Sequence, residues 1–110
     1  MPSEAATRVC FTLRLKPDRV DDYLKAHSTV WPEMLAALRD SGWHDYTLFI
    51  DADQALIVGY LVTDNFARAM AAIAGHEVNE RWQQGMAEYF DTAGTVDEAI
   101  VRLTEYFHLD

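Results

Sequence analysis

Residues 46–62 carry the sequence YTLFIDADQALIVGYLV, which predicts a β-hairpin in the middle of the chain. In an extended chain, Tyr46, Leu48 and Ile50 share one face of the first strand, and the second strand has a corresponding set at Leu56, Val58, Tyr60 and Val62. A period of two is typical of a strand with one buried face. Residues 51–54 form a short connection of the kind that joins two antiparallel strands.

The segment before this hairpin predicts a strand followed by a helical region. Residues 8–15 alternate in the same way as the hairpin strands. Residues 20–38 then place apolar side chains at helical spacing, with Pro32 suited to the first turn of a second helical piece. Asp18 is a residue type that caps helix starts, and Gly42 stands where a helix-ending glycine is expected.

The segment after the hairpin repeats this pattern in reverse order. Asp64 or Asn65 is expected to cap a helix whose apolar stripe covers residues 66–73. A second helical stripe covers residues 78–90, and residues 101–109 alternate as a last strand. The order is therefore strand, helix, strand, strand, helix, strand.

This order predicts an α+β, ferredoxin-like (βαββαβ) fold with an antiparallel sheet and its helices on one face. The other face needs a cover, and a second copy packed sheet to sheet would make a dimeric α/β barrel. We expect residues 1–110 to form a single domain, with residues 1–7 as a flexible N-terminal segment.

Composition excludes several function classes. The chain has 110 residues and a net charge of −9, which argues against nucleic acid and against anionic membrane surfaces as partners. Cys10 is the single cysteine, so neither an internal disulfide nor a cysteine-based zinc site can form within one chain. No apolar run is long enough to span a membrane, and residues 1–7 do not resemble a signal peptide, so a cytoplasmic protein is expected.

The residues that could carry chemistry are His, Tyr and Trp. Phosphate-binding loops, nucleophile elbows and paired-His metal helices are missing from the sequence, so no cofactor or metal is expected. Tyr23 and His27 are four residues apart and therefore share one helix face. His27 is either a core histidine with satisfied hydrogen bonds or an imidazole that transfers protons into a pocket.

Two further aromatic residues can likewise be interpreted as core residues or as residues of a ligand site. Tyr46 begins the alternating set of the first hairpin strand, and Trp82 lies on an apolar helical stripe. Either side chain could be core or a wall of a ligand site. His44, His76 and His108 lie at a strand start, a turn and the chain end, and have no metal-ligand spacing.

A local motif resembles a known family. Residues 23–33, YLKAHSTVWPE, are similar to the signature of the L-rhamnose mutarotase family, which has a Tyr, a His four residues later, and then Trp-Pro-Glu. The similarity continues in the same order at further positions: Gly42, Asp45-Tyr46, Asp51, Arg81-Trp82, Met86 and residues 105–109.

The resemblance implies a small dimeric enzyme, an isomerase that interconverts the α and β anomers of L-rhamnose or a closely related neutral deoxy sugar. In the family the His of this motif is the proton donor, which implies that role for His27. The same resemblance implies sugar contacts for Tyr23 and Tyr46, and the CH faces of a neutral sugar can stack on Trp82. Well-known members carry two adjacent Trp residues where this chain has Trp82 and Gln83, and their loop corresponding to residues 91–97 differs, so the preferred sugar is left open.

The chemistry is consistent with these residue types. Mutarotation takes a proton from the anomeric hydroxyl and gives one to the ring oxygen, which requires one good acid/base near neutral pH and no metal. The side chain of Gln83 is expected to bind sugar hydroxyls beside Trp82. Alternatives on the same fold are a cofactor-independent monooxygenase, a haem-binding protein, and a non-enzymatic ligand-binding dimer.

Overall fold

The computed structural model describes residues 7–91 and 99–109. Most of the expected N-terminal segment 1–7 and of the loop 91–97 lies outside these residues, and Thr7 already belongs to the first strand. The elements in chain order are β1 (Thr7–Arg14), α1 (Val20–Ala26), α2 (Pro32–Asp40), β2 (His44–Asp51), β3 (Leu56–Thr63), α3 (Phe66–Ala74), α4 (Glu77–Met86) and β4 (Val101–Leu103).

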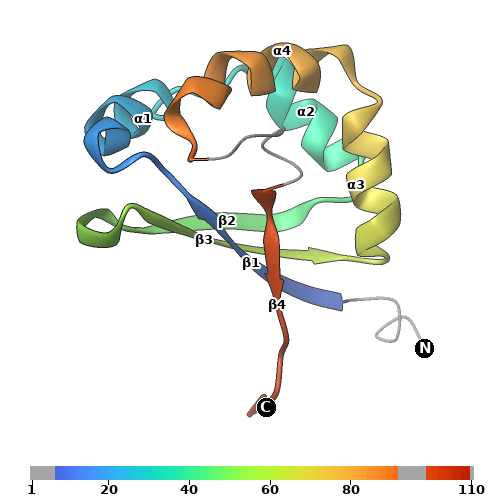
Figure 1. Cartoon of the computed structure of the whole chain (residues 1–110). Coiled ribbons are helices and arrows are strands. Elements are labelled where there is room, and N and C mark those ends of the chain that lie inside the picture. The colour runs from blue at the N-terminus through green and yellow to red at the C-terminus, as the bar shows by residue number, and fades with distance from the viewer. Residues whose placement is uncertain (1–6, 92–98, 110) are drawn as a thin grey trace.

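The four strands form one antiparallel sheet in the order β2-β3-β1-β4. Figure 1 shows all four helices on the same side of this sheet, with the other side uncovered. This arrangement confirms the predicted ferredoxin-like fold. No helix in the described ranges is long and apolar enough to cross a membrane.

The alternation in the strands separates a core face from an outer face. Val9, Phe11 and Leu13 of β1 are buried under the helices, and so are Ile57 and Leu61 of β3. The intervening side chains of β3 share one face, as their spacing predicted, and the structure shows that it is the half-buried, outer face (Leu56, Val58, Tyr60 and Val62). The sheet thus has one face packed against helices and a second apolar face without cover in the monomer.

Helix boundaries agree with most sequence signals. Pro32 occupies the first turn of α2, and Gly42 follows its end with a φ of +89°, a conformation that glycine adopts without strain. The Asn65 side chain caps α3 by accepting a hydrogen bond from the Arg68 N–H. The expectation for Asp18 was wrong: it lies inside a 3₁₀ turn and caps nothing, because that turn separates β1 from α1.

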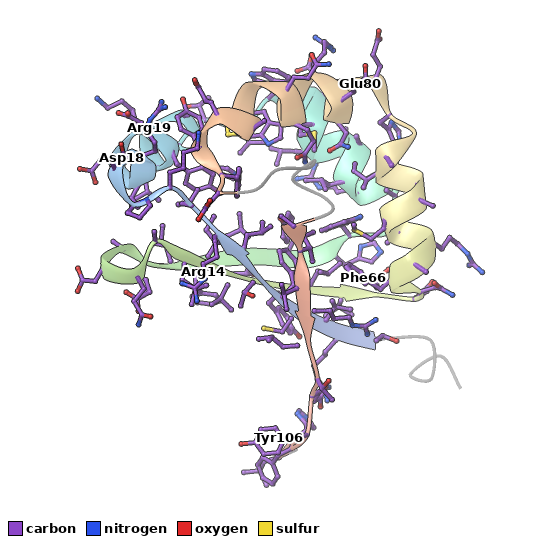
Figure 2. The ribbon with its side chains drawn as sticks, viewed as in Figure 1. Arg14, Asp18, Arg19, Phe66, Glu80 and Tyr106 are labelled. Atoms are coloured by element: carbon purple, nitrogen blue, oxygen red, sulfur yellow. The ribbon has the colours of Figure 1, made fainter. Side chains whose placement is uncertain are left out.

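The last strand is shorter than the alternation of residues 101–109 predicts. β4 ends at Leu103, which pairs with Cys10 of β1. The pairing with β1 covers only residues 101–103, although β1 itself continues to Thr7. The C-terminal residues leave the sheet, and Figure 2 shows Tyr106, which is 95% exposed, far from the helix layer.

Candidate active site

A cavity of about 340 Å³ lies between the helix layer and the sheet. Every residue that the sequence singled out for the site lines this cavity: Tyr23, His27, Tyr46, Trp82 and Gln83. They come from α1, β2 and α4, so the fold brings together side chains that are distant in sequence. The interpretation of these residues as core alone is therefore inadequate, because all of them border open space.

Tyr23 and His27 stand side by side at the end of α1. Their rings lie 5.3 Å apart, as expected for residues one helical turn apart. The His27 backbone N–H donates to the Tyr23 carbonyl at 2.9 Å and closes the last turn. The imidazole is thus held in place at a helix end and faces the cavity half-buried.

The Tyr23 hydroxyl stays protonated throughout the neutral range. The Tyr23 ring packs edge-on against Phe90 at 5.6 Å and is only 5% exposed. This burial raises the pKa of Tyr23 to about 12, because a phenolate would lose its hydration. Tyr23 is therefore a hydrogen-bonding group at the cavity wall and not a base.

His27 is held in its neutral form by its surroundings. Burial lowers the pKa of His27 below its usual value, because the imidazolium would be poorly hydrated, and a hydrogen bond with backbone partly opposes this effect. At neutral pH the imidazole then has a free nitrogen that accepts a proton. A base with a pKa somewhat below the working pH suits reversible proton transfer.

Trp82 forms the aromatic wall next to His27. The His27 ring meets the Trp82 indole edge-on at 5.5 Å, and the Trp31 ring does the same at 5.1 Å. Trp82 is 7% exposed, so it belongs to the core as well as to the cavity wall. Arg81 lies outside the cavity and is exposed, with its guanidinium 5.7 Å from the centre of the Trp31 ring.

Gln83 is paired with a second amide on the same helix. Its Nε2 donates to Asn79 Oδ1 at 3.3 Å, one turn earlier in α4. Asn79 is 4% exposed and also lines the cavity. Gln83 Oε1 is buried and has no hydrogen-bond partner among the described residues.

A bulge in β2 brings Tyr46 to the cavity. Between His44 and Thr47 the pairing with β3 shifts by one residue, and Asp45 takes a φ of +52°. Side chains three apart in a regular strand point to opposite faces, but the extra residue lets Trp43 and Tyr46 both face the helices. Their rings lie 5.0 Å apart, and both line the cavity.

Sequence reasoning missed Asn79 and Trp43 as wall residues. The available signal for Asn79 was its position four residues before Gln83, a polar residue inside an apolar stripe. Trp43 gave no signal, because its direction depends on the bulge. The described residues contain no group of His, Cys, Asp and Glu side chains that could hold a metal ion.

The chain is similar in sequence to proteins of one known family. A family model described as L-rhamnose mutarotase matches residues 8–109. An L-rhamnose mutarotase from Oceanobacillus iheyensis is 31% identical over 100 residues, which cover 91% of this chain and 95% of that protein. Another from Pectobacterium carotovorum subsp. carotovorum is 33% identical over 103 residues, which cover 94% of this chain and 98% of that protein.

Solved structures share the fold. The L-rhamnose mutarotase of Formosa agariphila has a TM-score of 0.75 at 24% identity, over 94% of this chain and 99% of that one. A dimeric ferredoxin-like protein from an uncultured marine organism has a TM-score of 0.56 at 11% identity, over 94% of this chain and 93% of that one.

Proposed function

Since the chain belongs to the L-rhamnose mutarotase family, we propose that its cavity binds L-rhamnose or a closely related neutral deoxy sugar and that His27 transfers the protons of the reaction. The chain is an isomerase that interconverts the α and β anomers of its sugar. The observation that carries the assignment of the site is the placement of His27, Tyr23, Tyr46 and Trp82 around one cavity.

The proposed reaction starts with the neutral imidazole of His27. It takes the proton of the anomeric hydroxyl, and the resulting imidazolium gives a proton to the ring oxygen while the bond from C1 to that oxygen breaks. C1 becomes the aldehyde of the open chain, which rotates and closes on its other face by the reverse steps. Because burial lowers the pKa of His27, the imidazolium is a stronger acid than in water, which favours protonation of the ring oxygen.

Tyr23 and Tyr46 orient the sugar in this scheme. A phenol that stays protonated donates a hydrogen bond to a sugar oxygen and accepts one from a sugar hydroxyl. Tyr46 lies at the more open side, 36% exposed, and Tyr23 lies deep beside His27. Together they would fix a hydroxyl at each end of the pocket and keep the anomeric carbon beside the imidazole.

The charge of the cavity supports a neutral substrate. The described residues that line it include no Lys, Arg, Asp or Glu. A phosphorylated or carboxylated sugar would enter without any cation to replace its hydration, which is unfavourable. The apolar faces of a neutral pyranose match the indole of Trp82 and the surrounding aliphatic side chains.

We also propose a homodimer packed sheet to sheet. The outer face of the sheet carries exposed apolar side chains at Phe49, Val101 and Leu103, which are 60%, 59% and 45% exposed. A contiguous apolar surface of this kind is typical of a protein interface. A solved structure with the same fold is a dimeric ferredoxin-like protein, which supports a dimer here. The cytoplasmic location expected from the sequence stays a prediction.

The direct test is saturation-transfer proton NMR on L-rhamnose at its anomeric resonances, with and without the protein. We expect protein-dependent exchange between the anomers that His27→Gln reduces by roughly 10²-fold or more. The matched control is His76→Gln, a histidine outside the cavity. A folded His27→Gln protein with full exchange activity would contradict the role of His27.

A further inference from the structure

The amide pair of Asn79 and Gln83 is a polar feature in an otherwise apolar part of the wall. The two residues lie one turn apart on α4, and both line the cavity. Their neighbours on that helix, Trp82 and Met86, are apolar wall residues. The proton-transfer scheme uses His27 and Tyr23 on α1, so nothing in it requires an amide on α4.

The pair is incompletely hydrogen-bonded as it stands. The bond from Gln83 Nε2 to Asn79 Oδ1 occupies one donor and one acceptor. Gln83 Oε1 has no partner within the described part of the chain although it is buried. The Asn79 Nδ2 group forms no hydrogen bond to another described residue, but unlike Gln83 Oε1 it is not a fully buried atom. A buried polar atom without a partner is unfavourable, and native proteins retain one mainly where a ligand or an ordered water satisfies it.

A hydroxyl group complements the pair. It has one donor, which suits the Gln83 Oε1 acceptor, and lone pairs, which suit the Asn79 Nδ2 donor. The mutual hydrogen bond holds both amides near each other before a ligand arrives, which lowers the cost of ordering them. Apolar substituents, such as a methyl group, would leave both amide groups unsatisfied.

We propose that Asn79 and Gln83 form a hydroxyl-binding subsite that determines which sugars the cavity accepts. This inference rests on the proposed function, and it adds that the bound hydroxyl is one other than the anomeric hydroxyl. A site built to hydrogen-bond a hydroxyl rejects analogues that lack it, because its own polar groups are then left unpaired. Sugars with that hydroxyl are favoured, and their deoxy counterparts are disfavoured.

The test compares variants across a set of sugars that differ by one hydroxyl each. The sugars are L-rhamnose, its 2-deoxy, 3-deoxy and 4-deoxy counterparts, and L-mannose, which carries an extra hydroxyl on C6. Gln83→Met removes the acceptor with little change in shape and keeps a good helix former. Gln84→Met makes the same change at the next residue, which is exposed and outside the cavity. Asn79→Leu is the second variant.

Each protein is measured for kcat/KM of anomer exchange and for sugar binding by intrinsic tryptophan fluorescence. In the unmodified protein, kcat/KM for the preferred sugar should be about 10-fold or more higher than kcat/KM for the sugar that lacks one particular hydroxyl. Gln83→Met should lower kcat/KM for the preferred sugar by about that factor and leave the other sugar unchanged, so that the ratio falls towards one. Gln84→Met should keep the original ratio.

The outcomes separate the subsite from the proposed function. If the ratio of kcat/KM between the two sugars is the same in the unmodified protein and in Gln83→Met, the subsite is overturned. This holds even if the enzyme is active. Absence of exchange on every sugar would contradict the proposed function, while the binding ratios would still decide on the subsite. If Asn79→Leu does not fold, Gln83→Met alone gives the decision.

Discussion

Replacement of Gly59 by alanine should destabilise the protein through one specific collision. Gly59 lies on β3 directly opposite Phe11 of β1, and the Phe11 ring lies across it. A Cβ added at Gly59 would overlap the end of this ring and lie 2.7 Å from its Cε1 and Cε2 atoms. Glycine is therefore required here by a close approach of an aromatic ring and not by an unusual backbone conformation.

The expected magnitude follows from this overlap. Carbon atoms in contact are normally about 3.5–4.0 Å apart, so the ring must move by about 1 Å. Phe11 has no exposed surface and is packed in the core, so this movement strains its neighbours. Overpacking of this kind costs about 1–3 kcal/mol, from which about 0.5–1 kcal/mol is regained because alanine is less flexible than glycine. Gly59→Ala should lower the unfolding free energy by about 1–2 kcal/mol.

The assay is thermal and denaturant unfolding with two comparison variants. Gly85→Ala is the matched control: its Cβ would have no neighbour within 4 Å, and it lies in α4, where alanine is preferred by about 0.5–1 kcal/mol. The same substitution should therefore have opposite signs at the two positions. Phe11→Leu, introduced together with Gly59→Ala, should relieve part of the strain and give a favourable coupling energy in a double-mutant cycle.

Two results would refute this reasoning. Gly59→Ala could be as stable as the unmodified protein, or its effect could simply add to that of Phe11→Leu. Phe11 also borders the cavity, so a shift of its ring changes the shape of the cavity wall. A rise in KM for the sugar should therefore accompany the loss of stability.

Four further outcomes are expected. The exchange rate should rise with pH through an inflection below 6.5, because burial lowers the pKa of His27 and the neutral form starts the reaction; a pH–rate profile with the inflection above 6.5 would contradict this order of proton transfers. Stability should fall as pH rises from about 10 to about 12, because the unfolded chain ionises its tyrosines near 10 whereas the pKa of Tyr23 is raised to about 12; denaturant unfolding of Tyr23→Phe should lack this dependence. Trp82→Phe should raise KM more than it lowers kcat, since a stacking surface binds ground and transition states about alike, and steady-state kinetics on folded protein decides this. Light scattering should give twice the chain mass of 12.5 kDa, and a monomer at micromolar concentration would exclude the dimer.

The sequence predicted the order of elements because each signal was local. The alternation within residues 46–62 and the helical spacing before and after it depend on which side chains share a face, and that follows from the period alone. The end of β4 could not be found this way. It depends on how far the pairing with β1 continues, which the alternation of side chains does not show.

The site was predictable to the extent that its residues lie on one helix. The spacing of Tyr23 and His27 fixed their common face, and the structure places both at the cavity. Asn79 and Trp43 were missed because their roles depend on other parts of the fold. The role of Asn79 depends on what α4 packs against, and the direction of Trp43 depends on a bulge two residues further along the chain. The resemblance to a family indicated the reaction. Residue spacing alone was compatible with several functions on this fold.

The separation of charge in this molecule has a consequence for the solutes it meets. The chain carries a net charge of −9, whereas the described lining of its cavity holds no formally charged side chain at neutral pH. The negative potential outside acts within about one Debye length, roughly 8 Å at physiological salt, and it acts only on ions. A net charge of this sign slows the approach of uronic acids, sugar phosphates and nucleotide sugars, whereas an uncharged monosaccharide is unaffected by it. The net charge of the protein thus disfavours anionic carbohydrates without any contact inside the pocket.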